Sequence, residues 1–367
     1  MSVFAVVIFI AVTADFIFRS ISPRDHKALY CLTMFIVCTL VLGLRSPYVG
    51  GVDTSLVYIP AFEQALNTPL GAFMTDHDYR DPLFYIFTKL CTYVTGDYQV
   101  FLFIIAAICM GSFCVFVYRY SDHPVMSFAL FFALGYYAIE FEMLRHSLAA
   151  SVLLFAYPYI ERRKPVQFLL LVALATGFHM SAVVFVIAYL ASYAKVGLKQ
   201  GVILVFFIGF CYAFRGQVAT FLMGLLAASD RFSSNIGDYS TAGTFGLGGF
   251  FVVLAIWLFS YLILDRQERE TRATATFLNL GLYCTCIMSI TPILGELHRV
   301  AMFFGFSLVL LLPRAFKHSI IRNGQSRKVA YGMVLTVLLA YFFFIGVGGY
   351  ELADYQFFWD VEGGLFR

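Results

Sequence analysis

The chain has 367 residues, of which 61% are hydrophobic and only 13% charged, and its formal net charge is +3. Soluble domains carry roughly 25% charged residues, so a water-soluble fold is excluded because it could not bury this much apolar surface. The small net charge gives no reason to expect a nucleic-acid partner. The composition therefore predicts an integral membrane protein.

Ten apolar stretches follow one another along the chain and are candidates for membrane-crossing helices, which need roughly 17 to 25 residues. They are residues 2–18, 28–44, 98–118, 124–141, 145–160, 201–215, 246–264, 274–292, 299–312 and 329–347. Pro82–Val94 is too short to span and is predicted to be re-entrant. Val166–Tyr193 is too long for one straight span and is interrupted at Gly177-Phe178-His179, which predicts two short helices that meet at a turn.

These stretches predict an all-α polytopic membrane protein with about 12 transmembrane helices plus a re-entrant segment. We expect residues 1–367 to form a single integral membrane domain. Lys and Arg indicate its orientation, because cytoplasmic loops carry an excess of basic residues. Six loops on one predicted side hold 17 of the 25 Lys and Arg residues, namely 19–27, 119–123, 161–165, 194–200, 265–273 and 313–328. Both termini and two large external loops, 45–81 and 216–245, then lie on the other side.

One part of the second external loop has a helical pattern. Within Gln217–Ser229, apolar residues recur at the spacing of an amphipathic helix. Such a helix would lie on the outer membrane surface, or it would continue the preceding span.

Polar residues that lipid tolerates poorly gather on the predicted outer side, and such residues mark substrate pathways. They are Asp53, His77, Asp78, Arg80, Asp81, Glu140, Glu142, Arg145, His146, His179, Glu296, His298 and Arg299. For Glu140, Glu142, Asp76 and Asp78 we expect simple solvation at a loop end. Arg145 and Arg299 stand at the starts of two helices, where unpaired N–H groups and a bidentate guanidinium suit a phosphate or pyrophosphate. The alternative for each is an arginine that reaches lipid headgroups.

Three residues compete as the general base for a sugar hydroxyl. Asp81 stands beside Arg80 and directly before a proline, and its alternative role is to cap the short helix that follows. His179 lies at the break between two half-helices, where it could also cap the turn. Asp53 lies in the same external region and competes with both.

No metal or other cofactor is expected. Four histidines on the outer side have carboxylates nearby in sequence, but their spacing does not match a tight ligand set. The chain also has no Gly-rich nucleotide loop and no Gly-x-Ser-x-Gly elbow. ATP-driven and serine-hydrolase chemistry are therefore not expected.

Five short motifs occur in order along the chain. They are Gly51-x-Asp53 with Tyr58 downstream, Asp81-Pro-Leu-Phe-Tyr85, Arg145-x-x-Leu-Ala-Ala150, Gly177-Phe-His-Met-Ser-Ala182, and Arg299 opening a late span. Together they resemble the EpsG-like branch of the Wzy-type polysaccharide (O-antigen or exopolysaccharide) polymerases, over roughly residues 40–315. That family more often has Glu-Pro where this chain has Asp81-Pro82, so the carboxylate is kept but shortened.

The resemblance implies a glycosyltransferase of the bacterial inner membrane with a GT-C-like helical fold and an active site facing the periplasm. Its substrates would be undecaprenyl-pyrophosphate-linked oligosaccharide repeat units, joined with release of undecaprenyl pyrophosphate. For the catalytic base that this chemistry needs, Asp81 is the first candidate, followed by His179 and Asp53. The implied substrate-binding and pyrophosphate-binding residues are Arg145, Arg299, Arg80, His298, Tyr58 and Tyr85. Membrane lipid, a chain-length regulator and a flippase are the expected partners; for the tyrosines, anchoring at the interface is an alternative.

Two other kinds of function would use similar residues. A transporter or flippase for lipid-linked glycan would need arginines and aromatics in a cavity open to each side in turn, often between inverted repeats, and no such repeats are apparent. Another membrane transferase, such as an O-antigen ligase or a sugar acyltransferase, would use the same outer face with a different acceptor or donor.

Overall fold

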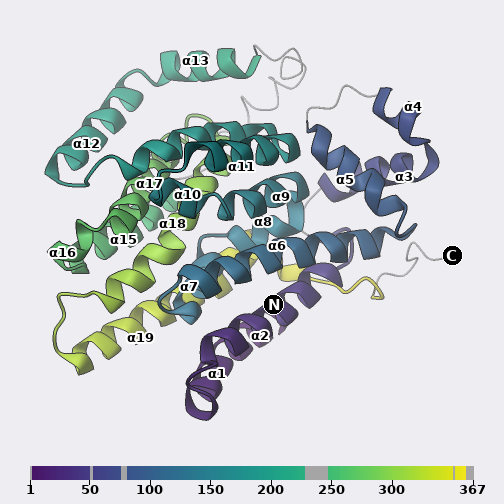
Figure 1. Ribbon diagram of the computed structural model, residues 1–367. Helices are drawn as coiled ribbons and strands as arrows, with labels where there is room; N and C mark the ends of the chain where they lie inside the picture. Colours follow the sequence, from purple (N-terminus) through teal and green to yellow (C-terminus); the bar gives the residue numbers. More distant parts are fainter. Residues whose placement is uncertain (1, 50–52, 76–80, 228–246, 350–351, 361–367) are drawn as a thin grey trace. The chain divides into compact units, whose positions relative to one another are not determined.

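The computed structural model describes residues 2–49, 53–75, 81–227, 247–349 and 352–360. Every regular element in these ranges is a helix (Figure 1). The chain divides into two compact units, each described here by itself. Unit 1 comprises residues 1–159, 164–186 and 323–367, and unit 2 comprises residues 160–163 and 187–322.

Unit 1 is built from the N-terminal helices and the C-terminal segment. Its elements are α1 (Ser2–Ile21), α2 (His26–Gly43), the π-helix η1 (Thr54–Tyr58), α3 (Ile59–Asn67), α4 (Leu70–Thr75), α5 (Pro82–Thr92), α6 (Tyr98–Tyr120), α7 (Pro124–Ala133), α8 (Tyr136–Glu142), α9 (Leu144–Leu154), α11 (Pro165–Phe178), α19 (Gly324–Tyr341), the π-helix η4 (Phe342–Gly346), α20 (Val347–Gly349) and the 3₁₀ turn η5 (Leu352–Asp354). Two further elements, α10 (Tyr157–Glu161) and the 3₁₀ helix η2 (Met180–Ser192), run from one unit into the other.

Local sequence explains where several of these helices begin. Pro82, Pro124 and Pro165 each open a helix, at the position where the missing N–H costs nothing. Asp97 caps α6 by accepting the Gln99 N–H at 2.7 Å.

The packing of unit 1 brings the ends of three helices together. In this unit α2 packs on α6, α6 on α9, and α9 on α11, while α5 packs on α3 and α11. The α11 backbone lies close to a side chain of α5, since a Cβ at Gly177 would lie 2.5 Å from the Leu83 Cδ1. Because α9 and α11 are joined by a short connection, the start of α9 lies beside the end of α11 and the start of α5.

Unit 2 is centred on an antiparallel pair of long helices. Its elements are α12 (Leu198–Ala213), α13 (Arg215–Ala227), α15 (Gly248–Ile263), α16 (Arg266–Arg269), α17 (Arg272–Ser289) and α18 (Leu297–Lys317). In this unit α17 packs on α18 and both pack on α15. Gly281 permits this close approach, because a Cβ there would lie 2.8 Å from both Leu308 and Trp257 side chains.

The helices confirm an all-α polytopic membrane protein. Among the described residues, five helices are long and apolar enough to cross a membrane: Val3–Ile21, His26–Gly43, Tyr98–Tyr120, Leu297–Lys317 and Gly324–Gly349. The number rises to seven if each of two bent pairs is one span: Pro124–Ala133 with Tyr136–Glu142, bent by 54°, and Lys199–Ala213 with Arg215–Gly224, bent by 88°. Four shorter apolar helices add to these, so the expected 12 crossings and the GT-C-like arrangement stay predictions.

Each of the ten predicted apolar stretches overlaps a helix, and the predicted break falls where expected. The α11 helix ends at Phe178 and η2 begins at Met180, with His179 extended between them. The stretch 145–160 is not one helix, because α9 ends at Leu154. Segment 45–81, predicted as a loop, contains the helical η1, α3 and α4.

One prediction about charge is wrong. We expected Glu140 to be solvated at a loop end, but it is only 9% exposed. The chain turns by 54° between α7 and α8 at Gly135, whose φ of 77° is left-handed, and the α8 helix that follows is buried along most of its length. This turn takes Glu140 into the interior of unit 1.

Candidate functional site

A buried carboxylate is the centre of the polar cluster in unit 1. Asp81 precedes α5 and is 3% exposed. Its Oδ1 accepts the Met180 N–H at 2.8 Å, and its Oδ2 accepts from Arg145 Nη1 at 3.0 Å. The same Oδ2 lies 3.6 Å from His179 Nδ1. Asp81 occupies the N-cap position of α5, as its alternative role predicts, but its side chain makes no capping hydrogen bond. The carboxylate is directed instead at Arg145 and the Met180 N–H.

Arg145 lies in the first turn of α9, as its sequence position predicts. Its guanidinium carbon stands 5.8 Å from the centre of the Tyr58 ring, at a distance typical of a cation–π contact. The side chain remains 23% exposed, and its buried Nε has no hydrogen-bond partner among the described residues. The hydrogen bond to Asp81 thus holds one guanidinium nitrogen of Arg145, and the guanidinium has further N–H groups that an anion can accept from.

His179 joins the cluster from the junction of α11 and η2. Its backbone is extended, with φ −154° and ψ 117°, and its N–H donates to the Ala175 carbonyl at 2.9 Å. The ring packs edge-on against that of His146, with 5.6 Å between centroids. Both histidines therefore belong to the group of side chains around Asp81.

Other predicted site residues of unit 1 are placed less centrally. Tyr85 lies on α5, and its ring packs on that of Phe84 at 5.7 Å. Asp53 is half-buried directly before η1. It is not one of the hydrogen-bond partners that the structure describes for Asp81. Arg80 lies outside the described residues, so its prediction stays open.

Unit 2 holds the second candidate arginine at the start of α18. Arg299 Nη1 pairs with Glu296 Oε2 at 3.0 Å, and the two side chains are 29% and 28% exposed. His298 Nδ1 lies 2.8 Å from the Gly295 carbonyl oxygen. Arg299 thus resembles Arg145 in two respects, since each lies in the first turn of a helix and pairs with one carboxylate.

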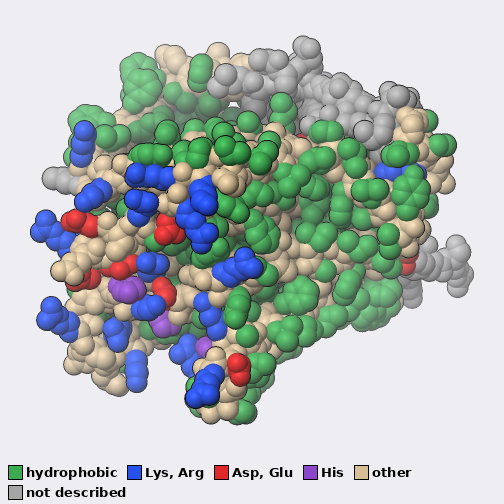
Figure 2. Space-filling model, viewed as in Figure 1, with side chains coloured by type: hydrophobic (Ala, Val, Ile, Leu, Met, Phe, Trp, Pro, Cys, Tyr) green, Lys and Arg blue, Asp and Glu red, His purple; other side chains and the backbone are tan. Residues whose placement is uncertain are grey.

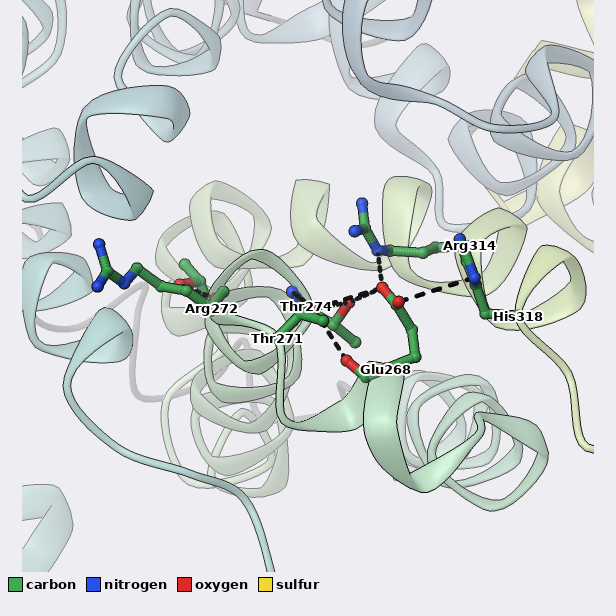
Figure 3. A network of polar contacts seen from close by, with 7 residues as sticks. Glu268, Thr271, Arg272, Thr274, Arg314 and His318 are labelled. Carbon is green, nitrogen blue, oxygen red and sulfur yellow. Dashed lines mark hydrogen bonds and ion pairs between the residues drawn. The ribbon is translucent and has the colours of Figure 1, made fainter.

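A second polar network lies at the other end of the α17–α18 pair (Figure 3). Glu268 Oε1 accepts from Arg314 Nε and from Thr274 Oγ1, both at 2.7 Å, and its Oε2 lies 3.7 Å from His318 Nδ1. Burial raises the pKa of the Glu268 carboxyl, but Thr274, Arg314 and His318 together lower it by more than burial raises it. The pKa therefore lies below its usual value. Arg272 points away from this carboxylate in Figure 3. We interpret the network as a structural link between α16, α17 and α18.

Basic side chains surround that end of unit 2. On the face in view in Figure 2, Lys and Arg gather around α16 and the adjoining ends of α15 and α18, whereas hydrophobic side chains cover much of the rest. Arg299 and Arg314 lie on the same helix about 22 Å apart along its axis, at about 1.5 Å per residue. The candidate anion-binding arginine and the basic cluster are therefore at opposite ends of unit 2.

The electrostatics of the unit 1 cluster favour an ionised Asp81. Burial raises the pKa of this carboxyl, but His179, the Arg145 guanidinium and the Met180 N–H together lower it below its usual value. In the part of the chain that the structure describes, no group of three or more His, Cys, Asp or Glu side chains could hold a metal ion. The arrangement can hold an anion at Arg145 and move a proton at His179.

Two groups of the cluster were not among the predicted site residues. The Met180 N–H gives no signal in sequence, because a backbone donor is present at nearly every position. His146 follows Arg145 directly and is 2% exposed. The sequence placed it among the outer polar residues, but no role in the site was predicted for it, although it lies beside a candidate arginine.

Comparison with known proteins assigns a family. Residues 28–358 match the family model described as the EpsG family. No curated protein and no solved structure gives a significant match to the chain. The matched region includes Asp81, Arg145, His179 and Arg299, and it covers most of the 367 residues. On this evidence the chain belongs to the EpsG family.

Proposed function

We propose that the protein is a polysaccharide polymerase of the bacterial inner membrane. It joins undecaprenyl-pyrophosphate-linked oligosaccharide repeat units on the periplasmic face. The growing glycan is transferred to the nonreducing-end sugar of a new unit, and undecaprenyl pyrophosphate is released. Membership in the EpsG family supports a polymerase-type membrane protein, and the residues of the two units supply the argument for the chemistry.

The observation that carries the proposal is the cluster in which Asp81 joins Arg145 to His179. Glycosyl transfer from a pyrophosphate needs cations that stabilise negative charge as the leaving group departs. It also needs a group that accepts the proton of the attacking hydroxyl. Arg145 and His179 provide these two properties within one cluster, and Arg299 is the candidate for a second cation.

The distribution of basic residues supports a periplasmic site. In unit 2, Arg299 begins α18 while the basic residues around α16 lie at the other end of the helix pair. In the α9–α11 region, Arg145 begins α9, whereas Arg162, Arg163 and Lys164 lie in the connection beyond its other end. Since basic loops face the cytoplasm, both candidate arginines would face outward.

The test is reconstitution of the purified protein in liposomes with its lipid-pyrophosphate-linked repeat unit and no nucleotide sugar. Mass analysis of the glycolipids should show a ladder of repeats for the wild type. Arg145→Ala and Arg299→Ala should each slow repeat addition by about 10²–10³-fold, the loss typical of removing one charge-stabilising donor. Arg266→Ala is the matched control, because that side chain is 90% exposed, and it should leave the ladder unchanged.

Other outcomes would identify another function. Unchanged monomer that nevertheless crosses the bilayer would contradict polymerisation and indicate a flippase. Transfer of the glycan to a lipid A core, with no ladder, would indicate a ligase.

A further inference from the structure

The oxygens of Asp81 are already occupied by donors of the protein. Oδ1 accepts the Met180 N–H, and Oδ2 accepts from Arg145 and faces His179. A general base must approach its substrate hydroxyl within about 2.6–3.2 Å. A carboxylate that is 3% exposed and already accepts one hydrogen bond on each oxygen is poorly placed for that approach.

The charge state of Asp81 leads to the same conclusion. Burial alone would raise the pKa of the carboxyl, but its three partners outweigh burial and lower the pKa below the usual value. A carboxylate with a lowered pKa binds protons weakly and is a poor general base near neutral pH. It is, however, a stable anion that can orient a cation and an imidazole.

His179 presents its two ring nitrogens to different surroundings. Nδ1 is buried and faces Asp81, while the side chain as a whole is 20% exposed. The separation of 3.6 Å is longer than an ordinary hydrogen bond, as catalytic pairs often are before substrate binds. A proton on Nδ1, directed at the carboxylate, leaves the Nε2 lone pair as the acceptor.

We infer that His179 Nε2 accepts the proton of the acceptor sugar hydroxyl, and that Asp81 is a positioning residue that holds both His179 and Arg145. This assignment rests on the proposed polymerase function. The hydroxyl proton moves to Nε2 as the hydroxyl oxygen bonds to the anomeric carbon of the donor. The bond from that carbon to the pyrophosphate oxygen breaks, and its electron pair leaves with the lipid pyrophosphate. The imidazolium then returns its proton to water.

Asp81 thus orients both the proposed base, His179, and one pyrophosphate-binding side chain, Arg145. The titratable and charged groups around His179 are Asp81 before α5, Arg145 and His146 on α9, and Tyr58 in η1, which lies against Arg145. Of these, Asp81 supplies the negative charge that stabilises the imidazolium formed during transfer.

The pH dependence of kcat/KM in the reconstituted reaction tests the assignment. His179→Gln should lower kcat/KM by about 10²–10⁴-fold, the usual contribution of a general base, and its residual activity should lack the acidic limb of the profile. Asp81→Asn should also be slow, but it should keep the acidic limb, because His179 is still present. An acidic limb that disappears in Asp81→Asn and persists in His179→Gln would overturn the assignment. His318→Gln, at the other end of unit 2 from Arg299, is the matched histidine control and should keep the wild-type profile.

A measurement without turnover separates this inference from the proposed function. The ¹⁵N shifts of the imidazole, assigned by difference from His179→Gln, should show the Nδ1–H form in the wild type and a mixture of tautomers in Asp81→Asn. Identical tautomers in both proteins would overturn the positioning role of Asp81. A folded wild type that makes no polymer, yet shows the expected tautomer change, would overturn the proposed function and leave the Asp81–His179 pairing supported.

Discussion

Gly177→Ala tests whether the close approach of α5 and α11 sets the position of Asp81. A Cβ at this position would lie 2.5 Å from Leu83 Cδ1, 2.6 Å from its Cγ and 3.3 Å from its Cβ. Ordinary carbon contacts are about 3.5–4.0 Å, so the Leu83 side chain must move by about 1 Å. We predict that the first turn of α5 moves with it. Asp81 stands directly before that turn and would move with it.

The expected loss of activity exceeds the expected loss of stability. Overpacking lowers the free energy of unfolding by about 1–3 kcal/mol, whereas replacing glycine by alanine in a helix raises it by about 1 kcal/mol. The free energy of unfolding should therefore fall by no more than about 2 kcal/mol. A displacement of about 1 Å in a catalytic group costs about 10²-fold in rate, so repeat addition should slow by about that factor.

The assay compares repeat addition and thermal unfolding in four proteins. They are the wild type, Gly177→Ala, Gly177→Ala with Leu83→Ala, and Gly332→Ala. The double variant removes the clashing atoms and should recover much of the rate. Gly332→Ala is the control, because a Cβ there meets nothing within 4 Å, and its rate should equal that of the wild type. If Gly177→Ala behaves like Gly332→Ala, or if Leu83→Ala brings no recovery, the reasoning is refuted.

Three further substitutions test separate contacts. Arg145→Lys keeps the charge but loses the planar guanidinium, which can bind Asp81 and an anion at the same time. Repeat addition should therefore fall at least about 10-fold. An unchanged rate would contradict the role of Arg145 in binding pyrophosphate. Glu268→Gln should lower the free energy of unfolding at pH 7 by about 2 kcal/mol, because it weakens the charge-assisted hydrogen bond that Arg314 donates to this carboxylate. Since the pKa of Glu268 is lowered by folding, that stabilisation is present above the unfolded pKa of about 4.3 and is lost as pH falls through the folded value. Unfolding measured at pH 7 and at pH 3 checks this, and a difference at pH 3 as large as the difference at pH 7 would be inconsistent with it. Lys89→Met removes two hydrogen bonds to carbonyl groups at the end of α3 and should cost about 2–3 kcal/mol in unfolding experiments; a cost near zero would show that water replaces the amine.

Much of the helical organisation could be predicted from hydropathy alone. Each predicted apolar stretch overlaps a helix because hydropathy is a local property, averaged over about 20 residues. The break at His179 was also visible, since Gly177 and a histidine interrupt an apolar run that is too long for one span. The ends of helices were harder to predict than their positions, and the sequence gives no clear signal for the end of α9 at Leu154.

The contacts of the site could not be predicted in the same way. Asp81 pairs with Arg145, 64 residues away, and with the Met180 N–H, 99 residues away. Its local sequence, an acid before proline, equally fits a helix cap. Only the packing of α5 on α11 brings the carboxylate to Arg145 and Met180, and this packing depends on a glycine that offers no side chain. The prediction for Glu140 was wrong for a related reason, because the burial of this side chain depends on the turn at Gly135.

The central claim is that each glycosidic bond is made at the expense of one lipid pyrophosphate. The most direct test is to count undecaprenyl pyrophosphate released against repeat units added, in a single reaction of the reconstituted wild type. The account predicts one lipid pyrophosphate for every bond formed, with no nucleotide sugar present. Repeat addition without lipid pyrophosphate release, or movement of the lipid-linked unit across the bilayer without any bond formed, would contradict it.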